Sequence, residues 1–196
     1  GYGYDPSVGP IYRTTIQRID YSSDTSTAAQ KGNLATTTRE SSGTGNQSFG
    51  YYAGGTTHPF ARISTVQRVD YSNDTATAAV KGPLSDAHRR DIGAAGNADF
   101  GYFMGGYNAI PGSNTWVTIV DRVDYSNDTA TASPKGPLSL ARKELTATSA
   151  RANGFVPIGP AVVSNAAAIA GSFNPTQFGY FGGGTAPTKS TVDRID

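Results

Sequence analysis

A short motif of aromatic residues and glycines recurs along the chain and restricts its fold more than any other feature. Its full forms are Phe49-Gly-Tyr-Tyr-Ala-Gly-Gly55, Phe100-Gly-Tyr-Phe-Met-Gly-Gly106 and Phe178-Gly-Tyr-Phe-Gly-Gly-Gly184, and Gly1-Tyr-Gly-Tyr4 is a reduced form. Each form is followed by Arg-Ile-Asp or Arg-Val-Asp. A chain that repeats itself in this way is built from similar small units that pack on their neighbours.

The spacing and composition of these repeats predict an all-β fold. The arginines of the Arg-Ile/Val-Asp motif are Arg18, Arg68, Arg122 and Arg194, which lie 50, 54 and 72 residues apart. The chain has 24 glycines, 11 prolines and 11 tyrosines among 196 residues, and only 16% of its residues are charged. Thr, Val, Ile, Tyr and Phe favour strands, whereas Gly, Asn, Asp, Ser and Pro favour turns. We therefore expect short antiparallel strands, four to each repeat.

One repeat shows the expected order of elements. It contains a small-residue inner strand at 91–96, a turn at 97–99, a second strand at 100–104, a variable loop at 107–116, a third strand at 117–125, a polar turn at 126–128 and an outer strand that starts at 129–132. Alternation along the third strand leaves neither face purely apolar, which is typical of a strand packed between two neighbouring units.

Glycines, arginines and aspartates of the repeats are the predicted structural motif. The glycine pairs allow positive φ or a close backbone approach, and they are Gly54, Gly55, Gly105, Gly106, Gly182 and Gly183. The arginines named above are followed two residues later by Asp20, Asp70, Asp124 and Asp196. Residues i and i+2 of a strand share a face and lie about 7 Å apart. Each Arg and Asp can therefore pair, or each can bond a neighbouring backbone.

This order resembles the kelch repeat, the blade of one class of β-propeller. Kelch blades carry a double glycine after the second strand, a Val-Glu-Arg-Tyr-Asp-like third strand and a Pro-x-x-Arg-like exit. These positions are filled by Gly54-Gly55, Val66 to Asp70 and Pro83 to Arg89 in one repeat, and by 105–106, 120–124 and 137–142 in the next. The outer-strand tryptophan of kelch repeats is replaced by Ala or Thr near 76–77 and 130–131. The stretch from Asp124 to Arg142 also resembles tandem repeats in virion-associated proteins of tailed phages that infect marine bacteria.

The repeats divide a single domain, 1–196, into three full units and a partial one. The frame is a partial unit at 1–39, full units at 40–89 and 90–142, and a longer last unit at 143–196 with an insert near 150–175. A propeller needs at least four blades to close. We therefore expect the chain to be a homo-oligomer or part of a larger repetitive chain.

The sequence argues against several chemical functions. Sixteen basic and 15 acidic residues nearly balance, so nothing favours nucleic-acid binding, and no apolar run is long enough for membrane insertion. Cysteine is absent, the histidines His58 and His88 have no second ligand at metal spacing, and no nucleophile-elbow sequence occurs. We expect no catalytic residue, no metal site and no cofactor, and hence no enzyme.

Aromatic and apolar residues outside the repeated frame are the predicted contact residues. They are Tyr12, Phe60, Tyr107 and Trp116 on loops, and Phe155 and Ile169 in the insert. Exposed aromatic side chains are enriched at interfaces. The resemblance implies a structural or adhesive module of an extracellular or virion surface, such as a phage tail fibre, whose loops contact a host glycan or protein. The alternatives are an architectural fibre subunit without a ligand and, less favoured, a carbohydrate-active propeller enzyme.

Overall fold

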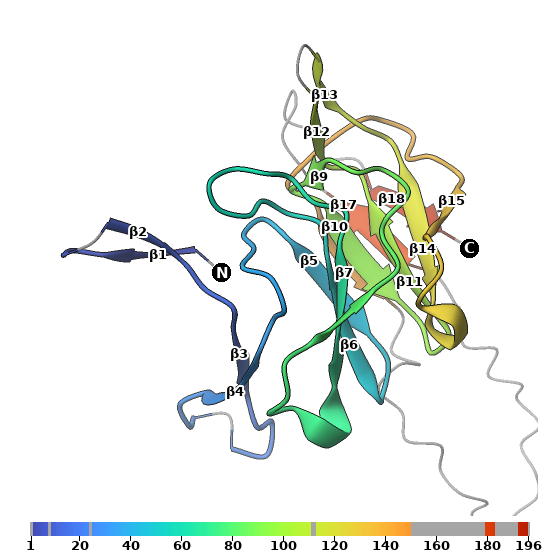
Figure 1. The fold of residues 1–196 in the computed structure, drawn as a ribbon. Coiled ribbons are helices and arrows are strands. Elements are labelled where there is room, and N and C mark those ends of the chain that lie inside the picture. The colour runs from blue at the N-terminus through green and yellow to red at the C-terminus, as the bar shows by residue number, and fades with distance from the viewer. Residues whose placement is uncertain are drawn as a thin grey trace, which may run out of the picture.

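The protein is all-β in the computed structural model, which describes residues 2–7, 9–23, 25–110, 113–149, 179–182 and 192–195 (Figure 1). Four small antiparallel sheets follow one another along this part of the chain. Sheet I contains β3 (Thr15–Arg18) and β4 (Ala29–Asn33), and sheet II contains β5 (Ser42–Gly45), β6 (Phe49–Ala53), β7 (Val66–Asp70) and β8 (Ala79–Lys81). Sheet III contains β10 (Gly93–Gly96), β11 (Phe100–Met104), β14 (Val120–Asp124) and β15 (Ser133–Lys135), and sheet IV contains β16 (Thr146–Ser149), β17 (Gly179–Gly182) and β18 (Val192–Ile195).

Shorter elements decorate these sheets. One hairpin pairs β1 (Tyr2–Asp5) with β2 (Gly9–Tyr12), and another pairs β12 (Tyr107–Ile110) with β13 (Ser113–Trp116) and with β9 (Arg89–Arg90). Single turns of 3-10 helix, η1 (Tyr71–Asn73) and η2 (Tyr125–Asn127), follow the third strands of sheets II and III.

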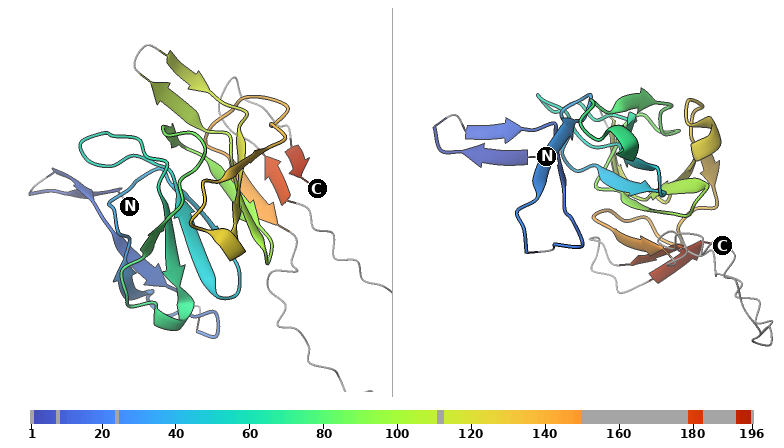
Figure 2. Two further views of the ribbon diagram at one scale, coloured as in Figure 1. Left: turned by 45° about the vertical axis from the view of Figure 1, so that its right-hand side comes forward. Right: turned by 90° about the horizontal axis from the view of Figure 1, so that it is seen from below.

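Sheets II, III and IV lie side by side through their first strands. Strand β10 lies against β5 on one side and against β16 on the other (Figure 2). In the described residues no sheet closes on itself. The first strands consist largely of small residues such as Gly93, Ala94 and Ala95, which lets neighbouring sheets approach closely at this position.

The apolar core lies between the sheets, because both faces of the central strands are covered. Tyr51 of sheet II and Phe103 of sheet III are fully buried. The ring of Tyr51 stacks on that of Tyr125 with 4.5 Å between centroids. In β14, Val120, Asp121 and Val123 are all buried, so both faces of that strand are covered, as predicted.

The double glycines adopt the backbone conformation expected of them. The φ angles of Gly54, Gly55, Gly105 and Gly106 are +65°, +99°, +58° and +102°. A Cβ atom on Gly55 would lie 2.4 Å from the carbonyl oxygen of Arg39. Both the left-handed backbone and the close approach therefore require glycine there.

Three details of the predicted repeat are wrong. The variable loop at 107–116 is the β12–β13 hairpin, stabilised by the additional pairing of β12 with β9. The reduced motif at 1–4 does not form a second strand of the first unit, because β1 pairs with β2 through a turn at Pro6. The outer strand of sheet III was expected to start at 129–132 but begins at Ser133. The backbone N–H of Ala132 does not pair within sheet III, because it donates to Pro83 O, which follows sheet II, at 2.8 Å.

Candidate binding surface

Predicted contact residues from separate loops meet at one end of the sheets. The Tyr12 and His58 rings make an edge contact with 5.3 Å between centroids. The Arg39 guanidinium lies 5.6 Å from the ring centroids of both Tyr12 and Phe60. Phe60 follows the cis His58–Pro59 bond in the loop between β6 and β7, and its side chain is 65% exposed.

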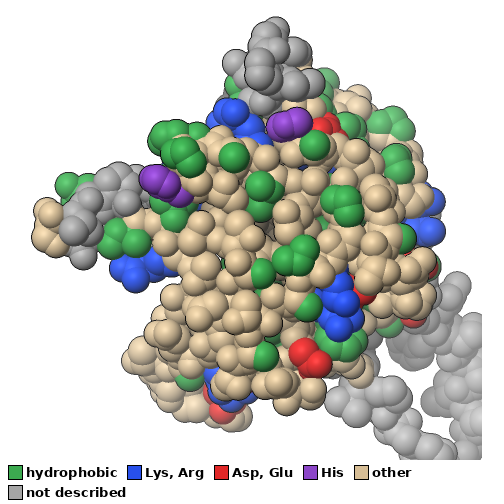
Figure 3. All heavy atoms as spheres, in the orientation of Figure 1, with side chains coloured by type: hydrophobic (Ala, Val, Ile, Leu, Met, Phe, Trp, Pro, Cys, Tyr) green, Lys and Arg blue, Asp and Glu red, His purple; other side chains and the backbone are tan. Residues whose placement is uncertain are grey.

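A second pair of contact residues lies on the β12–β13 hairpin. Tyr107 is directly opposite Trp116, so their side chains share one face of the hairpin. The Arg90 guanidinium lies 5.0 Å from the centroid of the Tyr107 ring, and Trp116 is 40% exposed. We call the combined set the aromatic–arginine surface, and its members are Tyr12, Arg39, His58, Phe60, Arg90, Tyr107 and Trp116. In Figure 3 the histidine side chains lie on the upper part of the molecule with hydrophobic side chains near them, whereas basic side chains are spread over this face.

One carboxylate joins the two halves of this surface. Glu40 Oε2 accepts hydrogen bonds from Arg90 at 2.7 Å and from Thr56 Oγ1 at 2.9 Å, and Glu40 Oε1 lies 3.5 Å from Arg39 Nε. Burial would raise the pKa of Glu40, but the bonds from Arg90 and Thr56 together hold it below the usual value. Glu40 is therefore a stable anion that holds both arginines in place.

The position of Glu40 is repeated in the neighbouring units. Glu40, Asp91 and Glu144 have positive φ angles of 60°, 55° and 58°. The backbone N–H of Asp91 donates to Glu40 O at 3.0 Å, and that of Glu144 donates to Asp91 O at 2.8 Å. Burial and the nearby Glu40 charge raise the pKa of Asp91. These bonds fix the spacing of the residues that precede each first strand.

We expect an NMR titration of the Glu40 carboxyl group to have its midpoint below the usual 4.5. Because this pKa is lower in the folded chain than in the unfolded chain, Glu40 stabilises the fold above the unfolded value, and that contribution is lost as pH falls through the folded value. Arg90→Gln should raise the midpoint, since burial remains and the strongest bond is lost. Arg68→Gln, which removes an arginine bound to Asp128 instead, should leave it unchanged.

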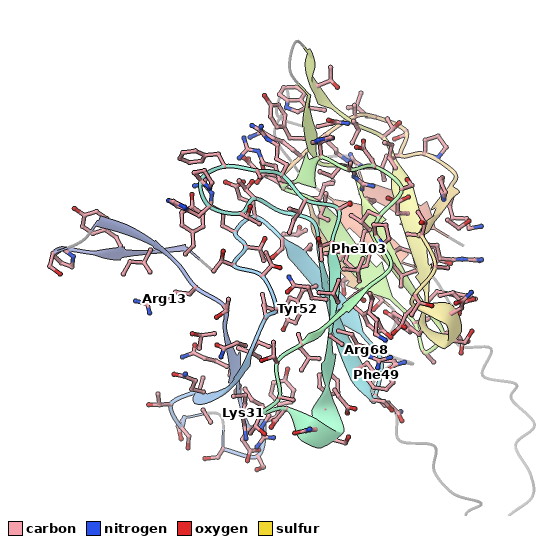
Figure 4. The ribbon with its side chains drawn as sticks, in the orientation of Figure 1. Arg13, Lys31, Phe49, Tyr52, Arg68 and Phe103 are labelled. Carbon is pink, nitrogen blue, oxygen red and sulfur yellow. The ribbon has the colours of Figure 1, made fainter. Side chains whose placement is uncertain are left out.

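The repeated arginines and aspartates have structural roles away from this surface. Arg68 lies over the Phe49 ring at 4.3 Å, as Figure 4 shows, and its Nη1 donates to Asp128 of the next repeat at 2.7 Å. Asp70 instead accepts from the backbone N–H and hydroxyl of Ser72 at 2.9 and 2.6 Å. The same Asp–Ser bonds occur at Asp20 and Asp124. The Arg and Asp of one motif therefore do not pair with each other in the residues for which side chains are described.

Several predicted residues cannot be placed on this surface. Phe155, Ile169, Gly183 and Asp196 lie outside the described residues, as does the insert at 150–175. Gly182 and Arg194 belong to β17 and β18, of which only the backbone is described.

Sequence reasoning missed the charged members of the surface. Arg39, Glu40 and Arg90 are not among the predicted contact residues, and the sequence raises His58 only as a metal ligand. A signal is present, because Arg39-Glu40, Arg90-Asp91 and Lys143-Glu144 repeat a basic–acidic pair before each first strand. The sequence does not show that the ion pair forms between two units, from Arg90 of one unit to Glu40 of the unit before it.

The described residues contain no group of three or more His, Asp or Glu side chains arranged to hold a metal ion. Among the same residues no helix has the length and apolar character needed to cross a membrane.

Comparison with known proteins supports the fold alone. No protein-family model matches the chain, and no curated protein matches it either. A solved structure titled "Structure of YjhT" is similar over 92% of this chain, with a TM-score of 0.64 and 15% sequence identity. The chain spans about half of that structure, 48% of its length. At this identity the likeness is one of all-β architecture.

Proposed function

We propose that the protein is a non-enzymatic structural or adhesive repeat module of an extracellular or virion surface assembly. Its sheets are kelch-like propeller blades, and its aromatic–arginine surface contacts a host glycan or protein. Two aromatic groups linked through a pair of arginines carry the proposal. Tyr12 and Phe60 lie around Arg39, and Tyr107, opposite Trp116, lies against Arg90. Glu40 joins the two arginines. All four aromatic residues lie outside the repeated frame, so their gathering is not a consequence of repeated packing.

The blade architecture is supported by the arrangement of the sheets. Each full repeat with described side chains forms a four-stranded antiparallel sheet in sequence order, and the first strands of successive sheets are neighbours. Such units cannot bury their faces alone and require neighbours on both sides. A homo-oligomer or a longer repetitive chain follows from that requirement.

The chemistry of the surface suits a ligand with both apolar and polar groups. Phe60 and Trp116 present exposed ring surface, and the guanidinium groups of Arg39 and Arg90 are held against aromatic rings. Aromatic rings supply rigid contact area, and a guanidinium group donates to paired oxygens. A sugar offers such a combination, as does a protein loop.

Alanine substitutions test this proposal. We expect Phe60→Ala and Trp116→Ala each to weaken binding to host-surface glycans or proteins about tenfold or more, a loss typical of an aromatic anchor. The matched control is Tyr21→Ala, because Tyr21 is 93% exposed and lies outside the aromatic–arginine surface. Glycan arrays and adsorption to host cells would measure the change.

Other outcomes favour the alternatives. Uniformly absent signal across host polysaccharides and proteins would favour an architectural fibre subunit without a specific ligand. Turnover of a polysaccharide by the purified chain would favour a carbohydrate-active enzyme.

A further inference from the structure

The turns that follow the third strands of sheets II and III are each held by a matching set of groups on the preceding sheet. Asp128 accepts from Arg68 Nη1 at 2.7 Å and lies 3.1 Å from Lys81 Nζ. The backbone N–H of Gly82 donates to Asp128 O at 2.8 Å. Tyr51 completes the set, since its hydroxyl donates to the same carboxylate at 3.0 Å.

The preceding interface repeats this arrangement. Asp74 lies 2.6 Å from Arg18 Nη1 and 3.5 Å from Lys31 Nζ, and Figure 4 shows Lys31 near the end of sheet II that carries η1. The backbone N–H of Gly32 donates to Asp74 O at 2.7 Å. A Cβ atom on Gly32 would lie 2.0 Å from Ala76 O. At Gly82 the corresponding distance to the turn is also 2.0 Å, so both glycines are required by a tightly packed turn.

Sheet III carries the same set of groups, and none of the turns in the described residues lies against it. The residues equivalent to Tyr51, Arg68, Lys81 and Gly82 are Tyr102, Arg122, Lys135 and Gly136, which we call the turn-binding site. No described residue lies within 4 Å of a Cβ atom on Gly136, and Lys135 is exposed. Arg122 lies over the Phe100 ring at 4.3 Å, as Arg68 lies over Phe49. Within the described part of the chain, its buried Nε has no hydrogen-bond partner.

We propose that the turn-binding site docks the Asn-Asp-Thr turn of a further repeat of this kind, through that turn's aspartate. Charge complementarity supports this occupant, since one carboxylate satisfies the basic pair at both filled interfaces. Backbone complementarity supports it too, because the Gly136 N–H matches the donors at Gly32 and Gly82. Sheet IV packs beside sheet III through β10 and β16, as sheet III packs beside sheet II through β10 and β5.

A peptide titration on the intact protein tests the proposal. The probe is a capped peptide that copies Asp124 to Ala132, and the readout is the amide signal of Gly136 in a ¹H–¹⁵N spectrum. We expect this signal to shift and saturate in the millimolar range. The affinity obtained from this titration should fall at least tenfold for the peptide with asparagine at the Asp128 position. The same loss is expected when the unaltered peptide is titrated into the Arg122→Gln/Lys135→Gln chain. The Gly82 amide, already bound to Asp128 O, is the internal control and should not move.

Covalent attachment provides a second measurement, because a tether raises the effective concentration of the turn. A copy of 125–138 is joined after Asp196, in one form with its aspartate and in another with asparagine there. The aspartate form should melt about 2–4 °C higher than the asparagine form. Equal shifts of Gly136 with both peptides would overturn the proposal. An unmoved Gly136 signal combined with equal melting temperatures would also overturn it.

Discussion

Replacing Arg89 by methionine is expected to lower the free energy of unfolding by about 3–5 kcal/mol. Arg89 and Asp121 are both fully buried, and Arg89 Nη1 donates to Asp121 Oδ2 at 2.6 Å. Burial lowers the pKa of Arg89, and the Asp121 charge opposes that shift. Without the guanidinium, Asp121 would be left as a buried charge bonded only to the backbone N–H and hydroxyl of Ser85. Denaturant unfolding followed by circular dichroism measures the loss.

Another repeat of the chain shows which uncharged residues can occupy the positions of Arg89 and Asp121. Thr38 and Gln67 occupy the corresponding positions in sheet II, and both are buried without charge. Arg89→Thr combined with Asp121→Gln should therefore recover a large part of the stability lost in the single variant. A double variant no more stable than Arg89→Met would contradict the view that the uncompensated charge causes the loss.

Gly82→Ala is expected to lower the free energy of unfolding by about 1–3 kcal/mol, because it overpacks the contact between sheets II and III. The added methyl group would lie 2.0 Å from Ala130 O and 2.5 Å from Ala130 C. Both are backbone atoms that cannot rotate away. The turn that contains Asp128 would have to move, which would weaken the bonds to Arg68 and Lys81.

Gly136→Ala is the matched control for this variant. Gly136 is in the same position of the next repeat, but a methyl group placed on it would have no atom of a described residue within 4 Å. We expect its unfolding free energy to stay within about 0.5 kcal/mol of that of the unaltered chain. Thermal unfolding of the two variants side by side separates packing from the intrinsic effect of removing glycine. Equal losses in both variants would contradict the packing explanation.

The repeat was predictable to the extent that local chemistry determines it. The strand at Phe100–Met104 was placed correctly because aromatic residues favour extended backbone and the double glycine that follows ends the strand. The β12–β13 hairpin was not predicted, and part of what stabilises it, the pairing of Tyr107 with Arg90, lies outside the hairpin's own sequence. Likewise, the sequence placed Arg68 and Asp70 on one face but could not show that Arg68 binds Asp128, 60 residues away.

The aromatic–arginine surface was predictable only in part, for a related reason. Aromatic residues outside the repeated frame were identifiable because they break a pattern. The arginines that hold them follow the pattern and are therefore hard to distinguish from the scaffold. Which arginine forms the salt bridge with Glu40 depends on how neighbouring sheets are offset. That offset is set by the packing of one sheet on the next and cannot be read from the sequence.

The buried guanidinium of Arg89 also gives the two halves of the aromatic–arginine surface different anchors. It donates to Gly105 O and Phe103 O at 3.1 Å and to Ile119 O at 3.3 Å, which clamps both ends of the hairpin that presents Tyr107. In sheet II the Thr38 hydroxyl is in the corresponding position, and it donates to Gly54 O at 3.2 Å and to Arg39 O at 3.4 Å. The two halves of the surface are thus anchored by different chemistry, a buried cation behind the Tyr107 hairpin and a neutral hydroxyl at the start of the Phe60 loop.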